Sequence, residues 1–195
     1  MILVVDLSYR AGSLSLDEFV GPVGHIVRKE GFPTLIRHYT DLSLQNIESA
    51  TGVIICGTAL KDFGYLEGLG RFAWLPSFPC PVLGICAGMQ VLVRVHGGNV
   101  HPAMGIGMAS QQVVTPDPLL EGKDQFEAYE LHSLSVTPPS SFMVLAISRS
   151  GVQMIRHRER PIYGVMFHPE VRNEWLIRRF LSLCRPGNRQ TDELM

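Results

Sequence analysis

Short apolar runs alternate with amphipathic segments along the first half of the chain. Residues 2–5 form a continuous apolar run, which is typical of a strand buried on both faces of a parallel sheet. Residues 16–27 then carry apolar side chains at helical spacing. The same alternation predicts strands at 34–37, 52–56 and 82–85, and helices at 41–49, at 65–74 and from the last strand through residue 96. Such a series predicts a parallel sheet wrapped by helices.

The predicted helix at 16–27 carries its own start and stop signals. Ser15 and Glu18 have the spacing of a capping box, and Gly31 suits the end of the helix. Pro22 and Gly24 lie inside the segment, and a proline in a helix interior removes a hydrogen bond and clashes with the preceding turn. We therefore expect a kink or a late start in this helix.

The second half of the chain has strand signals at short spacing, with turn residues between them. The predicted strands lie at 106–115, 125–132, 142–148, 152–157 and 162–167, and residues 172–184 follow as an amphipathic helix. Such a run of strands predicts an antiparallel extension of the parallel sheet. The polar segment 185–195 begins with Arg-Pro-Gly and is expected to be a flexible C-terminal tail.

The composition narrows the classes of protein that this pattern can represent. The chain has 195 residues, 46% of them apolar, so one domain can bury a full core. Its 17 Lys and Arg against 18 Asp and Glu leave no basic stripe, so nucleic acid and membrane surfaces are not expected partners. The four cysteines match neither a metal-site spacing nor a disulfide framework. With no signal-peptide pattern and no membrane-length apolar stretch, we expect a cytoplasmic protein.

Cys86 stands at the junction between a predicted buried strand and a predicted helix. The sequence PVLGICAGMQ, residues 81–90, places Gly84 and Gly88 on either side of it. This is the G-x-nucleophile-x-G elbow with cysteine in place of serine. The helix N-terminus below the sulfur favours the thiolate, and the N–H of Ala87 is left to face an oxyanion. The alternative is a structural cysteine buried as a small hydrophobic side chain.

A second motif carries a candidate base. The sequence YGVMFHPE, residues 163–170, places His168 at the end of a predicted strand, with Glu170 shortly after it. A neutral imidazole can take a thiol proton, and a carboxylate beside it fixes the tautomer and stabilises the imidazolium. Taken alone, the motif also fits a surface strand end with an N-capping glutamate. Because sites collect where parallel strands end, the two motifs together predict one active site.

Both motifs resemble the signatures of the class I, triad-type glutamine amidotransferases. The resemblance extends to GVIICGTALKD, which is similar to the family's oxyanion strand and loop, and to YELHSLSV, and it covers about residues 1–184. Within the family, the chain looks closest to stand-alone archaeal-type chains and to the amidotransferase subunit of GMP synthetases. The resemblance implies a glutamine amidotransferase domain at 1–184. It also implies a three-layer α/β/α, flavodoxin-like fold whose mostly parallel sheet has an antiparallel extension.

The resemblance also implies roles for particular residues. Cys86 is implied to be the nucleophile, His168 the general base and acid, and Glu170 the group that orients His168. Further residues are implied to bind the oxyanion or glutamine: Ala87 with Gly57 or Thr58 for the oxyanion, and Gln90 and His132 for glutamine. We expect His132 to be a hydrogen-bonded loop residue rather than a catalytic one. Neither a metal nor a cofactor is implied.

The reaction implied by the family is hydrolysis of the side-chain amide of L-glutamine through a γ-glutamyl thioester. The sequence has neither a Walker A motif nor a pyrophosphatase loop, so the ammonia is expected to pass to a separate synthase subunit. Two alternatives stay open on the sequence alone. One is a partner-independent γ-glutamyl thiol hydrolase, and the other is a non-catalytic regulatory module of the same fold.

The chain departs from the family pattern at two places. Cys56-Gly57-Thr58-Ala59 stands where the family has a glycine-rich turn, and Thr58 cannot adopt a positive φ cheaply. Leu131 replaces the common serine before His132. These differences leave open whether the oxyanion site is formed without a partner, and how the α-groups of glutamine are bound.

Overall fold

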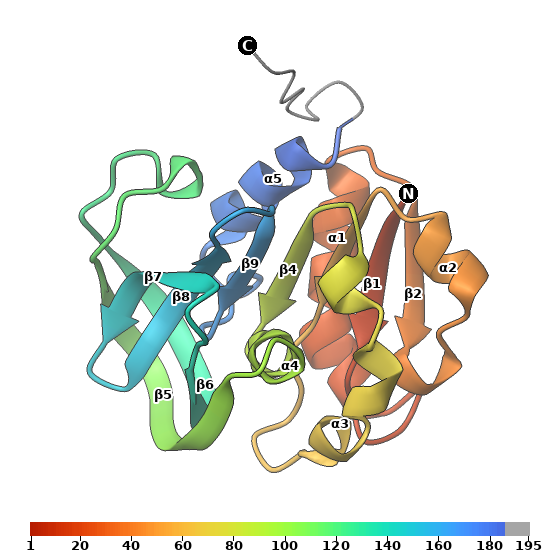
Figure 1. Cartoon of the computed structure of the whole chain (residues 1–195), viewed down its shortest axis with the longest axis horizontal. Coiled ribbons are helices and arrows are strands. Elements are labelled where there is room, and N and C mark those ends of the chain that lie inside the picture. Colours follow the sequence, from red (N-terminus) through yellow and green to blue (C-terminus); the bar gives the residue numbers. More distant parts are fainter. Residues whose placement is uncertain (186–195) are drawn as a thin grey trace.

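Nine strands form one mixed sheet in the part of the chain that this computed structural model describes, residues 1–185 (Figure 1). Their spatial order is β2-β1-β3-β4-β9-β8-β7-β5-β6. The strands are β1 (Ile2–Asp6), β2 (Thr34–His38), β3 (Gly52–Ile55), β4 (Val82–Ile85), β5 (Asn99–Val113), β6 (Gln125–Thr137), β7 (Phe142–Ser148), β8 (Gly151–His157) and β9 (Ile162–Val165).

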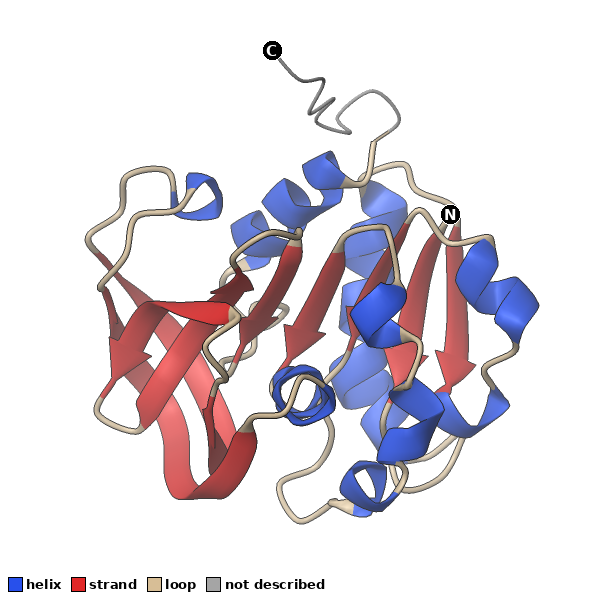
Figure 2. Ribbon diagram, in the orientation of Figure 1, coloured by secondary structure: helices blue, strands red, loops and turns tan. Residues whose placement is uncertain are grey.

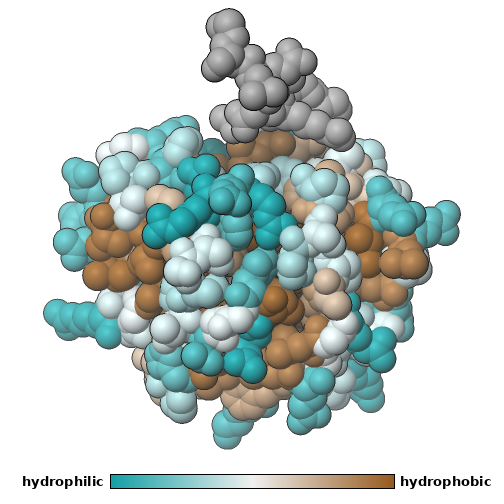
Figure 3. All heavy atoms as spheres, viewed as in Figure 1, coloured by the Kyte–Doolittle hydropathy of each residue, from teal (hydrophilic) through white to brown (hydrophobic). Residues whose placement is uncertain are grey.

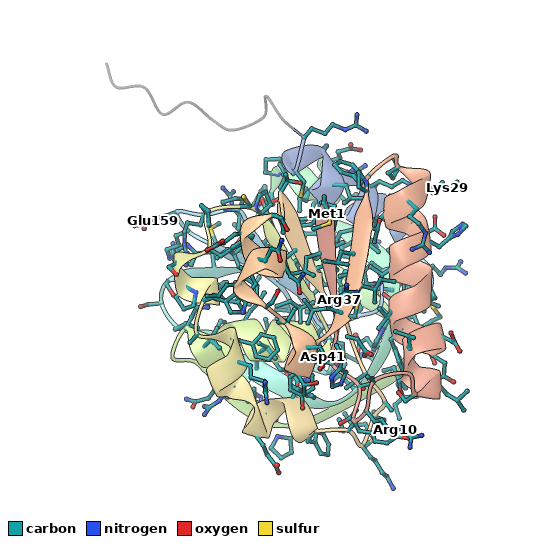
Figure 4. All side chains as sticks on the ribbon, turned by 90° about the vertical axis from the view of Figure 1, so that its right-hand side faces the viewer. Met1, Arg10, Lys29, Arg37, Asp41 and Glu159 are labelled. Atoms are coloured by element: carbon teal, nitrogen blue, oxygen red, sulfur yellow. The ribbon has the colours of Figure 1, made fainter. Side chains whose placement is uncertain are left out.

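The parallel half of the sheet consists of β2, β1, β3, β4 and β9. All but the edge strand β2 are buried along their whole length, because helices cover both faces. The helices α1 (Gly21–Lys29) and α5 (Glu174–Leu183) pack together on one face, and α4 (Ala87–Val95) lies on the other (Figure 1). Figure 4 shows β2 from the side with Arg37 exposed on it. The predicted α/β sandwich is confirmed.

Strands β8, β7, β5 and β6 extend the sheet in antiparallel fashion, as predicted, and curl away from the parallel strands (Figure 2). The long hairpin of β5 and β6 differs from the prediction. β5 begins at Asn99 rather than at residue 106, and β6 continues to Thr137 rather than ending at residue 132. A register shift between Pro102 and Gly105 lets the pairing continue past these two residues, which look like strand breakers in the sequence.

The predicted first helix starts late, as expected from its proline. Residues Leu16–Val20 form a π-helical turn, and the α-helix α1 begins only at Gly21, with Pro22 in its first turn. The predicted capping box is wrong, because the side chain of Ser15 makes no capping hydrogen bond. A capping box occurs instead at Ser43 and Asn46, before α2 (Leu44–Glu48).

The helix predicted at 65–74 is broken into shorter pieces. α3 spans only Gly64–Glu67, and a 3-10 helix follows at Leu69–Phe72. Gly68 separates the two, and a β-carbon there would meet the ring of Tyr39. This broken segment forms one wall of the site described below.

The surface and the chain ends add two observations. Hydrophobic residues on the face in Figure 3 lie in separate patches divided by hydrophilic ones. Within residues 1–185, no helix has the length and apolar character needed to cross a membrane. Of the predicted tail, residues 186–195 lie outside the described part of the chain.

Candidate active site

Cys86 occupies a strained elbow between β4 and α4. Its backbone angles are φ 49° and ψ −105°, a region that residues with a β-carbon rarely adopt. The N–H of Cys86 donates to the carbonyl of Val165 at 2.7 Å, which ties the elbow to β9. A β-carbon at Gly84 would lie 2.6 Å from the backbone of Gly88, and one at Gly88 would lie 2.1 Å from the carbonyl oxygen of Ile55. Both glycines are therefore required by space.

Backbone donors surround the sulfur of Cys86. Ala87 is the first residue of α4, so its N–H has no acceptor inside the helix. Among the residues that the structure describes, the N–H groups of Gly57 and Thr58 also have no hydrogen-bond acceptor. Thr58 does not adopt a positive φ. Gly57 is required by space instead, because a β-carbon there would lie 2.7 Å from Cε1 of His168.

His168 and Glu170 follow β9 as a buried, hydrogen-bonded pair. The Nδ1 of His168 lies 2.7 Å from Oε1 of Glu170, and the two side chains are each 1% exposed. The N–H of His168 donates to the carbonyl of Tyr129 at 2.9 Å, which fixes the backbone against β6. Phe19 packs on the imidazole, with ring centroids 5.4 Å apart. The carboxylate therefore orients the ring, as the spacing of the two residues predicted.

The electrostatics of the pair favour an imidazolium next to a sulfur. Burial disfavours the charged ring, but the Glu170 carboxylate and the neighbouring Cys86 thiol raise the pKa of His168 well above its usual value. Within the described residues, Nε2 of His168 has no well-aligned hydrogen-bond partner, and the thiol of Cys86 donates to the carbonyl of Leu131 at 3.6 Å. Catalytic hydrogen bonds often tighten only when substrate binds.

Two other buried cysteines are poorly suited to act as nucleophiles. Burial, together with the charges of Glu170 and Asp6, raises the pKa of Cys56 well above its usual value. Burial chiefly raises the pKa of Cys184 to about 12. A thiolate is the reactive form, so both side chains stay inert thiols near neutral pH. Their interpretation as packing residues agrees with these environments.

A small pocket opens beside the sulfur between the loop after β3 and the strand β6. Its lining residues are Thr58, Ala59, Leu60, Asp62, Phe63, Tyr65, Cys86, Ala87, Gln90, Leu131, His132, Ser133 and Leu134. The candidates Thr58, Ala87, Gln90 and His132 therefore meet at one place. Gly57, His168 and Glu170 lie behind Cys86 rather than in this lining.

Gln90 is held by Tyr65, a residue that no sequence motif singled out. The hydroxyl of Tyr65, on α3, donates to Oε1 of Gln90 at 2.5 Å. The Nε2 of Gln90 contacts only the sulfur of Met166, at 3.8 Å, and keeps a donor available. Burial chiefly raises the pKa of Tyr65, so its proton stays in place as the donor. The broken helical segment concealed Tyr65, because no periodic pattern aims it at the elbow.

His132 lies in strand β6, whereas the sequence led us to expect a loop. Its side chain is buried, its Nδ1 lies 3.2 Å from the carbonyl of Ala103, and its Nε2 lies 3.4 Å from Glu130. Gln111 donates to Glu130 at 2.8 Å and Ser150 at 2.6 Å. A buried polar network therefore supports the ring from the side opposite the pocket.

We expect Glu130 to make stability depend on acid pH. Burial alone would raise the pKa of Glu130, but hydrogen bonds from its neighbours lower it to about 2. Its contribution is present above the unfolded-state pKa near 4.5 and is lost as the pH falls towards 2. Between pH 5 and pH 2, Glu130→Gln should therefore lose about 3 kcal/mol less unfolding free energy than the wild type.

Urea unfolding curves at a series of pH values would measure this difference. Glu127→Gln, at an exposed position of the same strand, is the matched control and should keep the wild-type pH dependence. An equal acid sensitivity of Glu130→Gln and wild type would contradict the assignment.

No metal centre is built into this region. Among residues 1–185, no group of three or more His, Cys, Asp or Glu side chains is placed to hold a metal ion. The arrangement instead combines a strained cysteine, a buried imidazole–carboxylate pair and convergent backbone N–H groups. This combination can perform acyl transfer at a carbonyl carbon.

Comparison with known proteins identifies the class that this fold and site define. The family model described as glutamine amidotransferase class-I matches residues 18–181. The chain belongs to this family, and it is a glutamine amidotransferase that uses a cysteine nucleophile.

Individual relatives narrow the similarity. The chain is 36% identical to a subunit of the glutamine-hydrolyzing GMP synthase of Methanothrix thermoacetophila, over 73% of this chain and 84% of the relative. It is 31% identical to the GMP synthase subunit of the same name from Methanopyrus kandleri, over 84% of this chain and 94% of the relative. A crystal structure of a Thermoplasma acidophilum protein, described as a putative GMP synthase subunit of that kind, aligns with a TM-score of 0.81 and 25% identity, covering 94% of this chain and 92% of that one.

Proposed function

We propose that this chain is the glutamine-hydrolysing subunit of a two-subunit synthase, with a Cys86–His168–Glu170 triad. The observation that carries the proposal is the 2.7 Å His168–Glu170 pair placed behind a cysteine held at a φ of 49°. A strained elbow exposes one atom to substrate, and a buried carboxylate stabilises the imidazolium that forms beside it. A non-catalytic module has no need of either feature.

The first half of the proposed reaction breaks the amide bond. His168 takes the proton of the Cys86 thiol, and the thiolate attacks the side-chain amide carbon of L-glutamine. The N–H of Ala87, with that of Gly57 or Thr58, holds the oxyanion as it develops. His168 then gives its proton to the leaving nitrogen, the C–N bond breaks, and ammonia leaves a γ-glutamyl thioester on Cys86.

The second half restores the enzyme. His168 takes a proton from water, and the hydroxide attacks the thioester carbon. The tetrahedral intermediate collapses, the C–S bond breaks, and the proton on His168 returns to the sulfur. Glutamate is released, and Glu170 keeps the ring in one tautomer throughout. Gln90 and His132 are proposed to contact glutamine in the pocket.

The proposed acceptor of the ammonia lies on a separate synthase subunit. The relatives are named as subunits of GMP synthase, and this chain spans most of their length. We therefore propose the same kind of partner, a GMP synthase subunit without a glutamine-hydrolysing chain of its own.

Glutamate release from L-glutamine tests the proposal, measured for the chain alone and with such a partner. We expect the partner to raise the rate, and a diazoketone analogue of glutamine to alkylate Cys86 and no other cysteine. Turnover of γ-glutamyl compounds at a rate that no synthase changes would favour the thiol hydrolase instead. No turnover with the partner, together with no labelling of Cys86, would overturn the proposed function.

A further inference from the structure

We infer that Asp62 binds the α-ammonium group of the substrate and thereby selects free glutamine over amides that lack this group. The inference rests on the proposed function, because Asp62 lines the same pocket as Cys86. It answers how a chain with Leu131 before His132 recognises the amino-acid end of glutamine.

The carboxylate of Asp62 is oriented before any ligand binds. The hydroxyl of Thr58 donates to Oδ2 at 2.8 Å, and the N–H of Gly64 donates to Oδ1 at 3.3 Å. The N–H of Asp62 itself donates to the carbonyl of Ala59 at 2.9 Å, which closes the turn. Each carboxylate oxygen retains further acceptor capacity beyond these bonds. Thr58, a departure from the family's glycine-rich loop, therefore serves to fix this side chain.

This oriented carboxylate has no cation beside it. Among residues 1–185, no Lys, Arg or His side chain forms an ion pair with Asp62, and the pocket lining contains neither Lys nor Arg. The side chain is also half-buried, so its charge is only partly compensated by water. A ligand ammonium group in the pocket would supply the missing partner through a charge-assisted hydrogen bond.

The other walls of the pocket cannot supply the same contact. Leu131 and Leu134 present apolar side chains from β6. The Oε1 of Gln90 already accepts the hydroxyl of Tyr65 at 2.5 Å, which leaves the amide with donors rather than acceptors for a ligand. Of the side chains that line the pocket, only Asp62 is a carboxylate. Recognition of the ammonium group is thereby assigned to the loop after β3.

Binding measurements in a Cys86→Ala background test the inference without turnover and without a partner. The two ligands are L-glutamine and glutaramate, which has the same amide and carboxylate but no α-amino group. We expect Cys86→Ala to prefer glutamine, and Cys86→Ala with Asp62→Asn to bind glutamine about ten- to a hundredfold more weakly. Glutaramate should bind equally to both, because it has no ammonium group to lose a contact.

Kinetics of the complete chain with its synthase partner give a second measure. Asp62→Asn should raise the KM for glutamine with little change in kcat, since the contact is remote from the reacting carbon. Asp62→Glu should recover part of the preference for glutamine over glutaramate. Asp124→Asn, at an exposed position before β6, is the matched control and should behave as wild type.

The possible results separate this inference from the proposed function. A glutamine-to-glutaramate preference that Asp62→Asn leaves unchanged would overturn the role of Asp62, even if Cys86 is labelled and glutamine is hydrolysed. Equal weakening of both ligands would mean that Asp62 only shapes the loop, and it would also overturn the inference. Failure of the Cys86→Ala chain to bind either ligand would overturn the proposed function and the inference together.

Discussion

Replacing Cys86 is expected to abolish glutamine hydrolysis while leaving the fold intact. Cys86→Ala should lower kcat by about four to six orders of magnitude, because no other group can form the thioester. Burial and neighbouring charges keep Cys56 and Cys184 protonated, so neither can replace it. Glutamate release by the purified chain with its partner, and mass spectrometry of the labelled chain, would measure the loss.

The same position should also reveal the strain of the elbow. Cys86 adopts φ 49° and ψ −105°, which only glycine adopts without cost. Cys86→Gly should therefore be more stable to unfolding than Cys86→Ala by about 1 kcal/mol, although both are inactive. Cys80→Ala, at a half-buried position outside the site, is the control and should keep full activity. Wild-type turnover in Cys86→Ala would contradict the assignment of the nucleophile.

Gly88→Ala is expected to destabilise the protein strongly. Alanine in a helix normally gains about 0.5–1 kcal/mol over glycine, so propensity alone predicts a more stable protein. Here the added β-carbon would lie 2.1 Å from the carbonyl oxygen of Ile55, which belongs to the backbone of β3 and cannot rotate away. We expect the free energy of unfolding to fall by about 3 kcal/mol and Cys86 to lose its labelling, because α4 must move away from the sheet.

Thermal or urea unfolding of Gly88→Ala against a matched glycine would measure the effect. Gly70 is suitable, because a β-carbon there meets no atom within 4 Å and φ is not positive. Gly70→Ala should change stability by less than about 1 kcal/mol. The close packing of α4 on β3 would be contradicted if Gly88→Ala were as stable as the wild type.

Strong local patterns made most of the fold predictable from the sequence. The buried parallel strands read as apolar runs, and the late start of α1 followed from Pro22. The β5–β6 hairpin was underestimated, because Pro102 and Gly105 end a strand by local rules while a register shift preserves the pairing. The helix at 65–74 was overestimated, because Gly68 and Gly70 interrupt a pattern that apolar spacing alone supports.

The sequence by itself determined the candidate triad, since Cys86 and His168–Glu170 stand in local motifs whose chemistry depends on residue type and spacing. Tertiary structure alone decided the surroundings of that triad. Tyr65 bonds to Gln90 across the pocket, and Asp62 lines the same pocket from the loop after β3. The physical reason is that a short motif fixes neighbours along the chain, whereas pocket contacts join segments that only the packed sheet and helices bring together. Specificity is therefore found in the fold, while the reactive groups are already legible in the sequence.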